Sequence, residues 1–411
     1  MTKQDMNTDV LIVGGGPAGA LLGALLSRQG QRVIVAEKER DIERSFRGET
    51  IAARSVRTLE QLGFGPALSR HGYLALTGIS LREGGRKIVA VDYRRFPIGV
   101  VPIDIPQPAL IAAFLEDASQ HDNFTLLNGV RFAGLLERDG QIVGATLEHG
   151  RDEQTTVHAR LVVGADGRFS KVRKASGLAT KIEAMERDFL WFKLPRPADW
   201  GLDAQLVVQD DKHLVILPTF PDMLRVGYNL PKRGLSELRK QGLASFKAGI
   251  CELDPRLSQL VDEHIRDWND TSFLEIFTAE LEEWARDGLV LIGDASHTAT
   301  PILGQGVNLA IQDAVFLAPE IGLFFATHEQ GQLPKAALDA FVQKRRKHKD
   351  MVTRFQRIQE KSLSEFRPMK TLLRRARLKA LDLFPFKYRV LDRVLNAPHE
   401  SDPELRHAAG F

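Results

Sequence analysis

The chain has 411 residues, of which 43% are hydrophobic, and its formal charge is +3 at pH 7. This composition predicts a large core in one domain or two closely packed domains, and so small a net charge excludes a strong nucleic-acid partner. The single cysteine, Cys251, excludes an intrachain disulfide and a cysteine metal cluster. No His, Asp or Glu cluster has metal-ligand spacing, so we expect no metal. The first apolar run lacks a basic leader, and the run 314–326 is too short to span a bilayer and is interrupted by Pro319 and Glu320, so we expect a cytoplasmic protein.

The N-terminal segment has the pattern of a strand, a glycine loop, a helix and a second strand. Residues 10–13 (Val-Leu-Ile-Val) form a continuous apolar run, as in a buried parallel strand. The loop 14–19 reads Gly-Gly-Gly-Pro-Ala-Gly, a helix is expected over about 18–30, and a second strand over 33–35. This order of elements predicts a βαβ unit.

The glycines of this loop have separate physical roles in nucleotide binding. Gly14 permits a tight turn, Gly16 lets the backbone approach a pyrophosphate, and Gly19 lets the helix pack closely on the strand. The helix N-terminus offers N–H groups and partial positive charge to the phosphates. Glu37, which closes the second strand, would accept hydrogen bonds from ribose hydroxyls and disfavour a 2′-phosphate. The alternative is a purely structural glycine turn.

Two further segments place an aspartate after a buried apolar strand. Asp166 follows the strand 161–164, and Asp294 follows the strand 289–292. A carboxylate at such a position can accept a hydrogen bond from a sugar or ribityl hydroxyl. A helix is expected from about Gly306, and its N-terminus would stabilise the negative charge that a reduced flavin carries on its N1–C2=O edge.

The middle of the chain is predicted to be strand-rich and then helical. Strand patterns occur at 189–194, 204–209, 214–218 and 224–230, and helical patterns follow over 235–263. We expect this part to cover the substrate. The predicted division is a discontinuous nucleotide-binding domain (1–75, 105–178 and 284–335), a β-rich substrate domain (76–104 and 179–283) and a C-terminal helical region (336–411).

The three motifs in this order, over about residues 9–347, resemble the class A FAD-dependent monooxygenases, the p-hydroxybenzoate hydroxylase and UbiH-like aromatic hydroxylase family. The resemblance implies an α/β fold with a Rossmann-type, glutathione-reductase-like FAD-binding domain, an interleaved mixed α+β substrate domain and C-terminal helices. It implies that the segment 45–50 brings Arg47 near the flavin ring, and that Gln107 lies near the ribityl chain. The FAD contacts that it implies are Gly14, Gly16, Pro17, Ala18, Gly19, Glu37, Lys38, Arg47, Gln107, Val130, Asp166, Asp294, Pro301, Gly304, Gly306, Val307 and Asn308.

The same resemblance implies a reaction in which NADH or NADPH reduces FAD, and a C4a-hydroperoxyflavin then hydroxylates a hydrophobic, aromatic small molecule with one atom of O2. The flavin would carry the chemistry, with Arg47 and Pro301 near the ring. We expect His297 to pack or to position its loop rather than to act as a base. Two alternatives stay open: an FAD-dependent oxidase, dehydrogenase or reductase on the same fold, and a flavin-containing protein that sequesters a ligand without turnover.

The substrate cavity is expected between the flavin and the strand-rich part. Because alternate residues of a strand point to opposite faces, about half of the candidates should point away from it. The basic C-terminal stretch 367–393 is interpreted as a helix packed on the FAD domain or, alternatively, as weak contact with a membrane surface. A monomer or a homodimer is expected. The candidate lining residues are Phe189, Trp191, Leu214, Ile216, Pro218, Phe220 and Tyr228.

Overall fold

A parallel sheet carries the first glycine loop on a central strand. The computed structural model describes residues 2–41, 48–150, 153–301, 304–364, 368–389 and 391. The sheet order is β8 (Phe124–Asn128), β2 (Val33–Glu37), β1 (Thr2–Val13), β11 (Glu153–Gly164), β20 (Leu289–Leu291) and β19 (Ala285–Arg286), all parallel except β19. β9 (Val130–Arg138) and β10 (Gln141–His149) add an antiparallel extension to β11. β1, β11 and β20 end together, which brings the glycine loop and both aspartate motifs to one end of the sheet.

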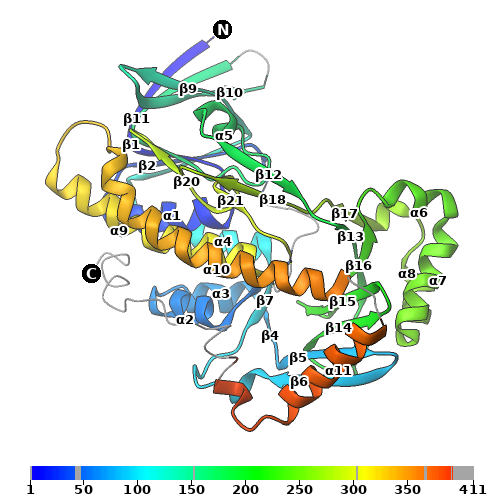
Figure 1. The fold of residues 1–411 in the computed structure, drawn as a ribbon. Coiled ribbons are helices and arrows are strands. Elements are labelled where there is room, and N and C mark those ends of the chain that lie inside the picture. Colours follow the sequence, from blue (N-terminus) through cyan, green and yellow to red (C-terminus); the bar gives the residue numbers. More distant parts are fainter. Residues whose placement is uncertain are drawn as a thin grey trace.

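Three helices pack together on this sheet. α1 (Pro17–Arg28) lies between α4 (Gln107–Ala118) and α9 (Gln305–Thr327), and α10 (Asp339–Ser364) runs beside α9 (Figure 1). α9 continues through Pro319, so the expectation that this proline interrupts the run was wrong. The cost of an interior proline, about 3 kcal/mol, is offset because the flanking side chains are buried in the core. α9 is long and apolar enough to cross a membrane, but two thirds of its apolar stretch (67%) is buried inside the protein.

A second sheet has seven strands and a helical layer on one face. Its order is β17 (Thr271–Leu274), β13 (Arg187–Pro195), β16 (Met223–Pro231), β15 (Lys212–Thr219), β14 (Asp203–Gln209), β5 (Gly78–Glu83) and β6 (Arg86–Asp92). Strands from two distant parts of the chain therefore share one sheet. The helices α6 (Leu235–Gln241), α7 (Leu243–Leu253) and α8 (Ser258–His264) bury a core cluster against one of its faces.

Two small sheets connect these layers. One has the order β12 (Thr180–Ala184), β18 (Phe277–Leu281) and β21 (His297–Thr298), and the other β3 (Gly48–Ile51), β7 (Ile103–Pro106) and β4 (Leu74–Ala75). The short helices α2 (Ala53–Gln61), α3 (Gly65–His71) and α5 (Lys171–Ser176) complete the elements near the motifs. The boundaries of the predicted domains stay a prediction.

The basic C-terminal stretch packs on the seven-stranded sheet. α11 (Pro368–Leu383) lies along β6 (Figure 1), and Arg375 pairs with the buried Glu83 at 2.8 Å. Lys387 donates a hydrogen bond to the carbonyl of Ala90. α11 therefore contacts β5 and β6, while Tyr388 and Leu391 of the same stretch pack in a cluster that includes Ala53 of α2.

Candidate functional site

The first glycine loop is in direct contact with the second motif. Gly14 has φ +109°, and a Cβ there would lie 2.4 Å from the carbonyl oxygen of Ala165. A Cβ at Gly19 would lie 2.0 Å from the carbonyl oxygen of Gly14, so the first turn of α1 packs closely against the glycine loop. A Cβ at Gly16, in contrast, would have no atom within 4 Å. The protein thus leaves open the backbone position at which a pyrophosphate is predicted to approach.

Two helices begin beside the third motif. Among the described residues, no side chain caps α1 at Gly16 or α9 at Gly304, and neither first turn holds an acidic residue. The 3-10 turn Gly293–Ala295 lies beside both helices, because a Cβ at Gly293 would meet Ala18 of α1 at 3.3 Å and Ala310 of α9 at 3.5 Å. The N–H groups at the ends of α1 and α9 are suited to phosphates and to the anionic edge of a reduced flavin.

Glu37 is held at the carboxyl end of β2, next to the glycine loop. It is 8% exposed, and its carboxylate accepts hydrogen bonds from the N–H groups of Gly15 (2.8 Å) and Glu39 (3.0 Å). This fixed orientation suits the predicted contact with a ribose. The neighbouring Lys38 is exposed and pairs with Glu39, whereas Val130 is buried in the core.

Asp166 stabilises its own loop. Its carboxylate accepts hydrogen bonds from the hydroxyl of Ser170 and from the N–H groups of Lys171 (2.7 Å) and Val172 (3.1 Å). These contacts cap the N-terminus of α5. Asp166 thus fixes the loop that contacts Gly14, and its contact with the cofactor stays a prediction.

Arg173 connects the second and third motifs and was missed from the sequence. It is 8% exposed and donates hydrogen bonds to the carbonyls of Asp294 (3.2 Å), Ala295 (2.9 Å) and Arg168 (2.7 Å). Burial lowers the pKa of Arg173, while the charges of Asp166 and Asp294 oppose that shift. The arginine thus fixes the backbone that presents the Asp294 carboxylate.

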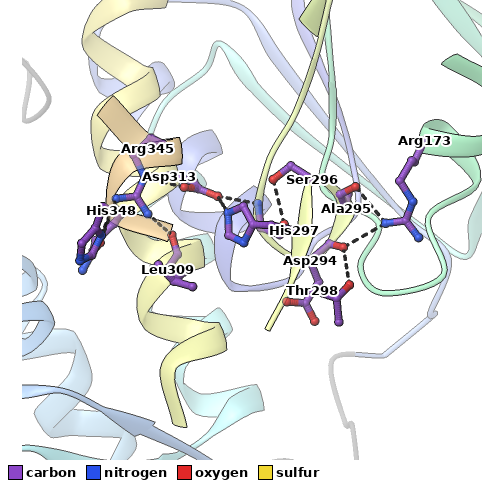
Figure 2. A network of polar contacts seen from close by, with 12 residues as sticks. Arg173, Asp294, Ala295, Ser296, His297, Thr298, Leu309, Asp313, Arg345 and His348 are labelled. Carbon is purple, nitrogen blue, oxygen red and sulfur yellow. Dashed lines mark hydrogen bonds and ion pairs between the residues drawn. The ribbon is translucent and has the colours of Figure 1, made fainter. Parts of the chain in front are cut away.

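The other side of the turn is held by a buried carboxylate on α9, also missed from the sequence. Asp313 is fully buried and accepts hydrogen bonds from the Gly293 N–H and His297 Nε2, both at 2.8 Å, and from Arg345 Nε at 2.6 Å (Figure 2). Burial raises the pKa of Asp313, but the charges of His297 and Arg345 outweigh it and hold the pKa at about 2. His297 positions its loop here, as expected.

The first turn of α9 is tied to β3. Asn308 accepts a hydrogen bond from the N–H of Ala52 (2.9 Å) and donates to the carbonyls of Thr50 (3.1 Å) and Gly304 (2.9 Å). A Cβ at Gly306 would lie 3.9 Å from Asp294 Oδ1, so the first turn of α9 and the third motif are neighbours. Arg47, predicted near the flavin ring, lies outside the described residues.

The predicted substrate residues lie on both faces of the seven-stranded sheet. Leu214, Ile216 and Tyr228 belong to the core beneath α6–α8, and Pro218 shares their face by alternation. These four residues therefore share the face that packs against α6–α8, and their place in a substrate cavity stays a prediction. Trp191 lies on the opposite face, stacked on Phe189 with ring centroids 5.7 Å apart. Phe220 abuts Gly72 of the FAD-binding part, since a Cβ there would meet its ring at 2.3 Å.

The face that carries Trp191 meets β7 in a polar cluster. Asp104 of β7 is fully buried, and its carboxylate accepts hydrogen bonds from the hydroxyls of Thr219 and Thr50 and pairs with Arg225 at 3.3 Å. Burial raises the pKa of Asp104, with Arg225 opposing. The Arg225 guanidinium lies 5.4 Å from the Trp191 ring centre. Because Thr50 also contacts Asn308, this cluster, unforeseen from the sequence, lies beside the loop predicted to line the flavin.

Comparisons with known proteins agree with this geometry. The family model described as "FAD binding domain" matches residues 7–356. The 6-methylpretetramide 4-monooxygenase of Streptomyces rimosus is 37% identical over 361 residues, which cover 87% of this chain and 84% of that protein. The 3-demethoxyubiquinol 3-hydroxylase of Escherichia coli is 26% identical, over 77% and 78% of the two chains. The crystal structure of Pseudomonas aeruginosa PqsL with 2-aminobenzoylacetate superposes with a TM-score of 0.77 at 23% identity, over 91% and 99% of the chains.

The extent of these matches decides between the functions left open by the sequence. They support the monooxygenase and neither the oxidase, dehydrogenase or reductase nor the ligand-sequestering protein. Two uncapped helix N-termini, an open glycine position and an acidic residue at the end of β2 suit FAD. The chain belongs to the FAD binding domain family and is a class A FAD-dependent monooxygenase that consumes NAD(P)H.

Proposed function

We propose that this monooxygenase hydroxylates an aromatic small molecule with an ionisable hydroxyl group, and that the Asp104 cluster orients that group. The relative from Streptomyces rimosus, named for 6-methylpretetramide, supports an aromatic substrate. The observation that carries the proposal is the pairing of Asp104 with Arg225 on the face opposite α6–α8. The cationic side chain of Lys193, one strand away, faces the same way. Burial and the charge of Arg225 lower the pKa of Lys193.

The chemistry comes from the bound cofactor and the geometry from the protein. The chemistry that bound FAD supplies is hydride acceptance from NADH or NADPH and activation of O2. One oxygen atom enters the substrate and the other leaves as water. The N-terminus of α9 stabilises negative charge on the cofactor. Arg225 stabilises an anionic substrate oxygen, and Trp191 offers a flat apolar surface for an aromatic ring. Of the other predicted lining residues, we propose that Phe220 also lines the substrate cavity.

The test measures substrate-stimulated NAD(P)H oxidation by the FAD-containing protein across a panel of phenols and their methyl ethers. Products formed under ¹⁸O2 are analysed by mass spectrometry, and incorporation of one labelled atom is expected. An unlabelled, dehydrogenated product, or no stimulation by any phenol, would contradict the proposed reaction.

The cluster is tested with Arg225→Met and a control on the other face, Tyr228→Phe. Loss of a charge-assisted hydrogen bond costs about 1.5–3 kcal/mol, so kcat/KM for the phenol should fall roughly 10- to 100-fold in Arg225→Met. Tyr228→Phe should leave kcat/KM unchanged, because its ring is buried beneath α7. An equal loss for phenol and methyl ether would show that Arg225 does not recognise the hydroxyl.

We also propose a cytoplasmic location with weak contact to an anionic membrane surface. Near the end of α11, Leu383 is 84% exposed, Phe386 54% and Phe384 44%. Exposed basic residues of the same segment, Arg377 and Lys379 among them, supply charge that anionic lipids attract.

A further inference from the structure

α10 packs on the FAD-binding part. Its buried face carries polar residues, whereas the buried face of such a helix is usually apolar. Arg345 is 1% exposed, and Lys349 and Gln356 are 5% and 1% exposed. Each contacts a segment next to the third motif: Arg345 binds Asp313, Lys349 pairs with Glu280 of β18, and Gln356 donates to the carbonyl of Thr300. α10 is therefore joined by directional contacts to Thr300 and to Asp313 and Glu280, which neighbour the third motif.

Arg345 makes the most extensive of these contacts. Besides its hydrogen bond to Asp313, its guanidinium donates to the Leu309 carbonyl (3.2 Å) and the Gln312 side chain (3.0 Å) of α9, and to His348 Nδ1 (3.1 Å) on its own helix (Figure 2). The fork geometry of a guanidinium fixes the angle as well as the distance of such contacts.

The Asp313 carboxylate links its own helix, α9, to α10 and to the segment 293–297. Oδ1 accepts from Arg345, while Oδ2 accepts from both Gly293 and His297. The N–H of Gly293 belongs to the turn that carries Asp294, whose carbonyl is held from the opposite side by Arg173. Removal of Arg345 leaves Oδ1 of a fully buried carboxylate without its guanidinium while Oδ2 keeps its contacts to Gly293 and His297, so we expect the carboxylate to shift and to carry the turn with it.

We propose that Arg345 is a positioning residue for FAD, which acts through Asp313 on the turn carrying Asp294 and thereby couples cofactor binding to the docking of α10. Reciprocity follows from thermodynamic linkage: if docked α10 strengthens FAD binding, bound FAD strengthens the docking of α10 by the same factor. A purely structural ion pair would instead stabilise the FAD-free and FAD-bound proteins equally.

The experiment compares wild type, Arg345→Met and Arg345→Lys with the control Arg357→Met. Arg357 lies on the same helix and pairs with Glu183, but both side chains are about half exposed, whereas Arg345 is buried. FAD affinity is measured by fluorescence titration of the FAD-free protein, together with melting temperatures with and without FAD and the visible absorption band of the bound flavin.

Arg345→Met should weaken FAD binding on the order of tenfold, alter the flavin band, and lower the melting temperature more with FAD than without. Arg345→Lys should recover part of the affinity, and Arg357→Met should bind FAD as wild type does. Equal losses of melting temperature with and without FAD, at unchanged affinity, would overturn the proposal.

A second measurement applies even if Arg345→Met does not fold. In the wild-type protein, FAD should slow amide hydrogen exchange across residues 339–364, where no FAD contact is predicted. Unchanged exchange in α10 on FAD binding would equally overturn the coupling.

Discussion

Two glycines of the first loop should respond in opposite ways to the same added methyl group. At Gly16, a Cβ has no atom of the protein within 4 Å, and the backbone at φ −74° accepts alanine. Alanine lowers the conformational entropy of the unfolded chain, which stabilises the folded protein by about 0.4–1 kcal/mol relative to glycine. Alanine is also a poorer N-cap residue than glycine, which costs a similar amount. The FAD-free protein should therefore keep its stability in Gly16→Ala to within about 1 kcal/mol.

FAD binding, however, should fall sharply in Gly16→Ala. The methyl group occupies the position at which the pyrophosphate approaches the start of α1, and loss of one hydrogen bond to a charged group costs about 1.5–3 kcal/mol. The dissociation constant should rise roughly 10- to 100-fold.

Gly19→Ala provides the contrast. A Cβ 2.0 Å from the Gly14 carbonyl oxygen is closer than the 3.0 Å below which real Cβ atoms essentially never come. The start of α1 must shift by the missing distance, and such overpacking costs about 1–3 kcal/mol. Gly19→Ala should therefore melt at a lower temperature even without FAD.

The assay is thermal unfolding of both FAD-free variants, followed by FAD titration. Gly16→Ala that binds FAD like wild type would refute the placement of the pyrophosphate. Gly19→Ala that is as stable as wild type would refute the packing argument.

Three further predictions concern charge and surface. Asp294→Ala should weaken FAD binding by about 1.5–3 kcal/mol, and unchanged FAD retention on gel filtration would contradict its role. Burial and the charge of Arg187 lower the pKa of His213 to about 3; the folded state keeps this histidine neutral, so stability falls as the pH drops from about 6.5 towards 3. His213→Phe should lose less stability than wild type between pH 7 and 5 in urea unfolding, and equal losses would contradict this reasoning. The protein should co-sediment with anionic liposomes at low salt and less at high salt; absence of binding at both would exclude the membrane contact.

Most of the FAD-binding part could be predicted from the sequence because its determinants are local. A continuous apolar strand, a glycine loop and an acidic residue at the next strand end specify the βαβ unit within residues 10–37. The same reasoning placed Asp294 at a strand end. For Asp166 it gave the position but not the hydrogen bonds from the Ser170 hydroxyl and two nearby N–H groups, which depend on how the following loop folds.

The residues that hold the third motif were missed because their spacing carries no pattern. Asp313 and Arg345 are separated by a helix end, a loop and the start of another helix. One feature did point to Asp313: it is the sole charged residue in the apolar run 307–318, and a charge on a buried helix needs a partner. The face on which the β15 candidates lie could not be predicted for another reason. Leu214-Val215-Ile216-Leu217 is apolar without alternation, so the sequence does not tell one face from the other.

The parallel pairing of β5 with β14 limits how this enzyme can be divided or recombined. Residues 78–83 lie beside 203–208 although more than a hundred positions separate them. A fragment that begins after β6 would leave the backbone of β14 with unpaired N–H and C=O groups along that side, a template for aggregation with other chains. A chimera that exchanges substrate recognition between relatives must therefore transfer the β5–β6 hairpin together with β13–β17, even though the hairpin precedes the second and third motifs in the chain.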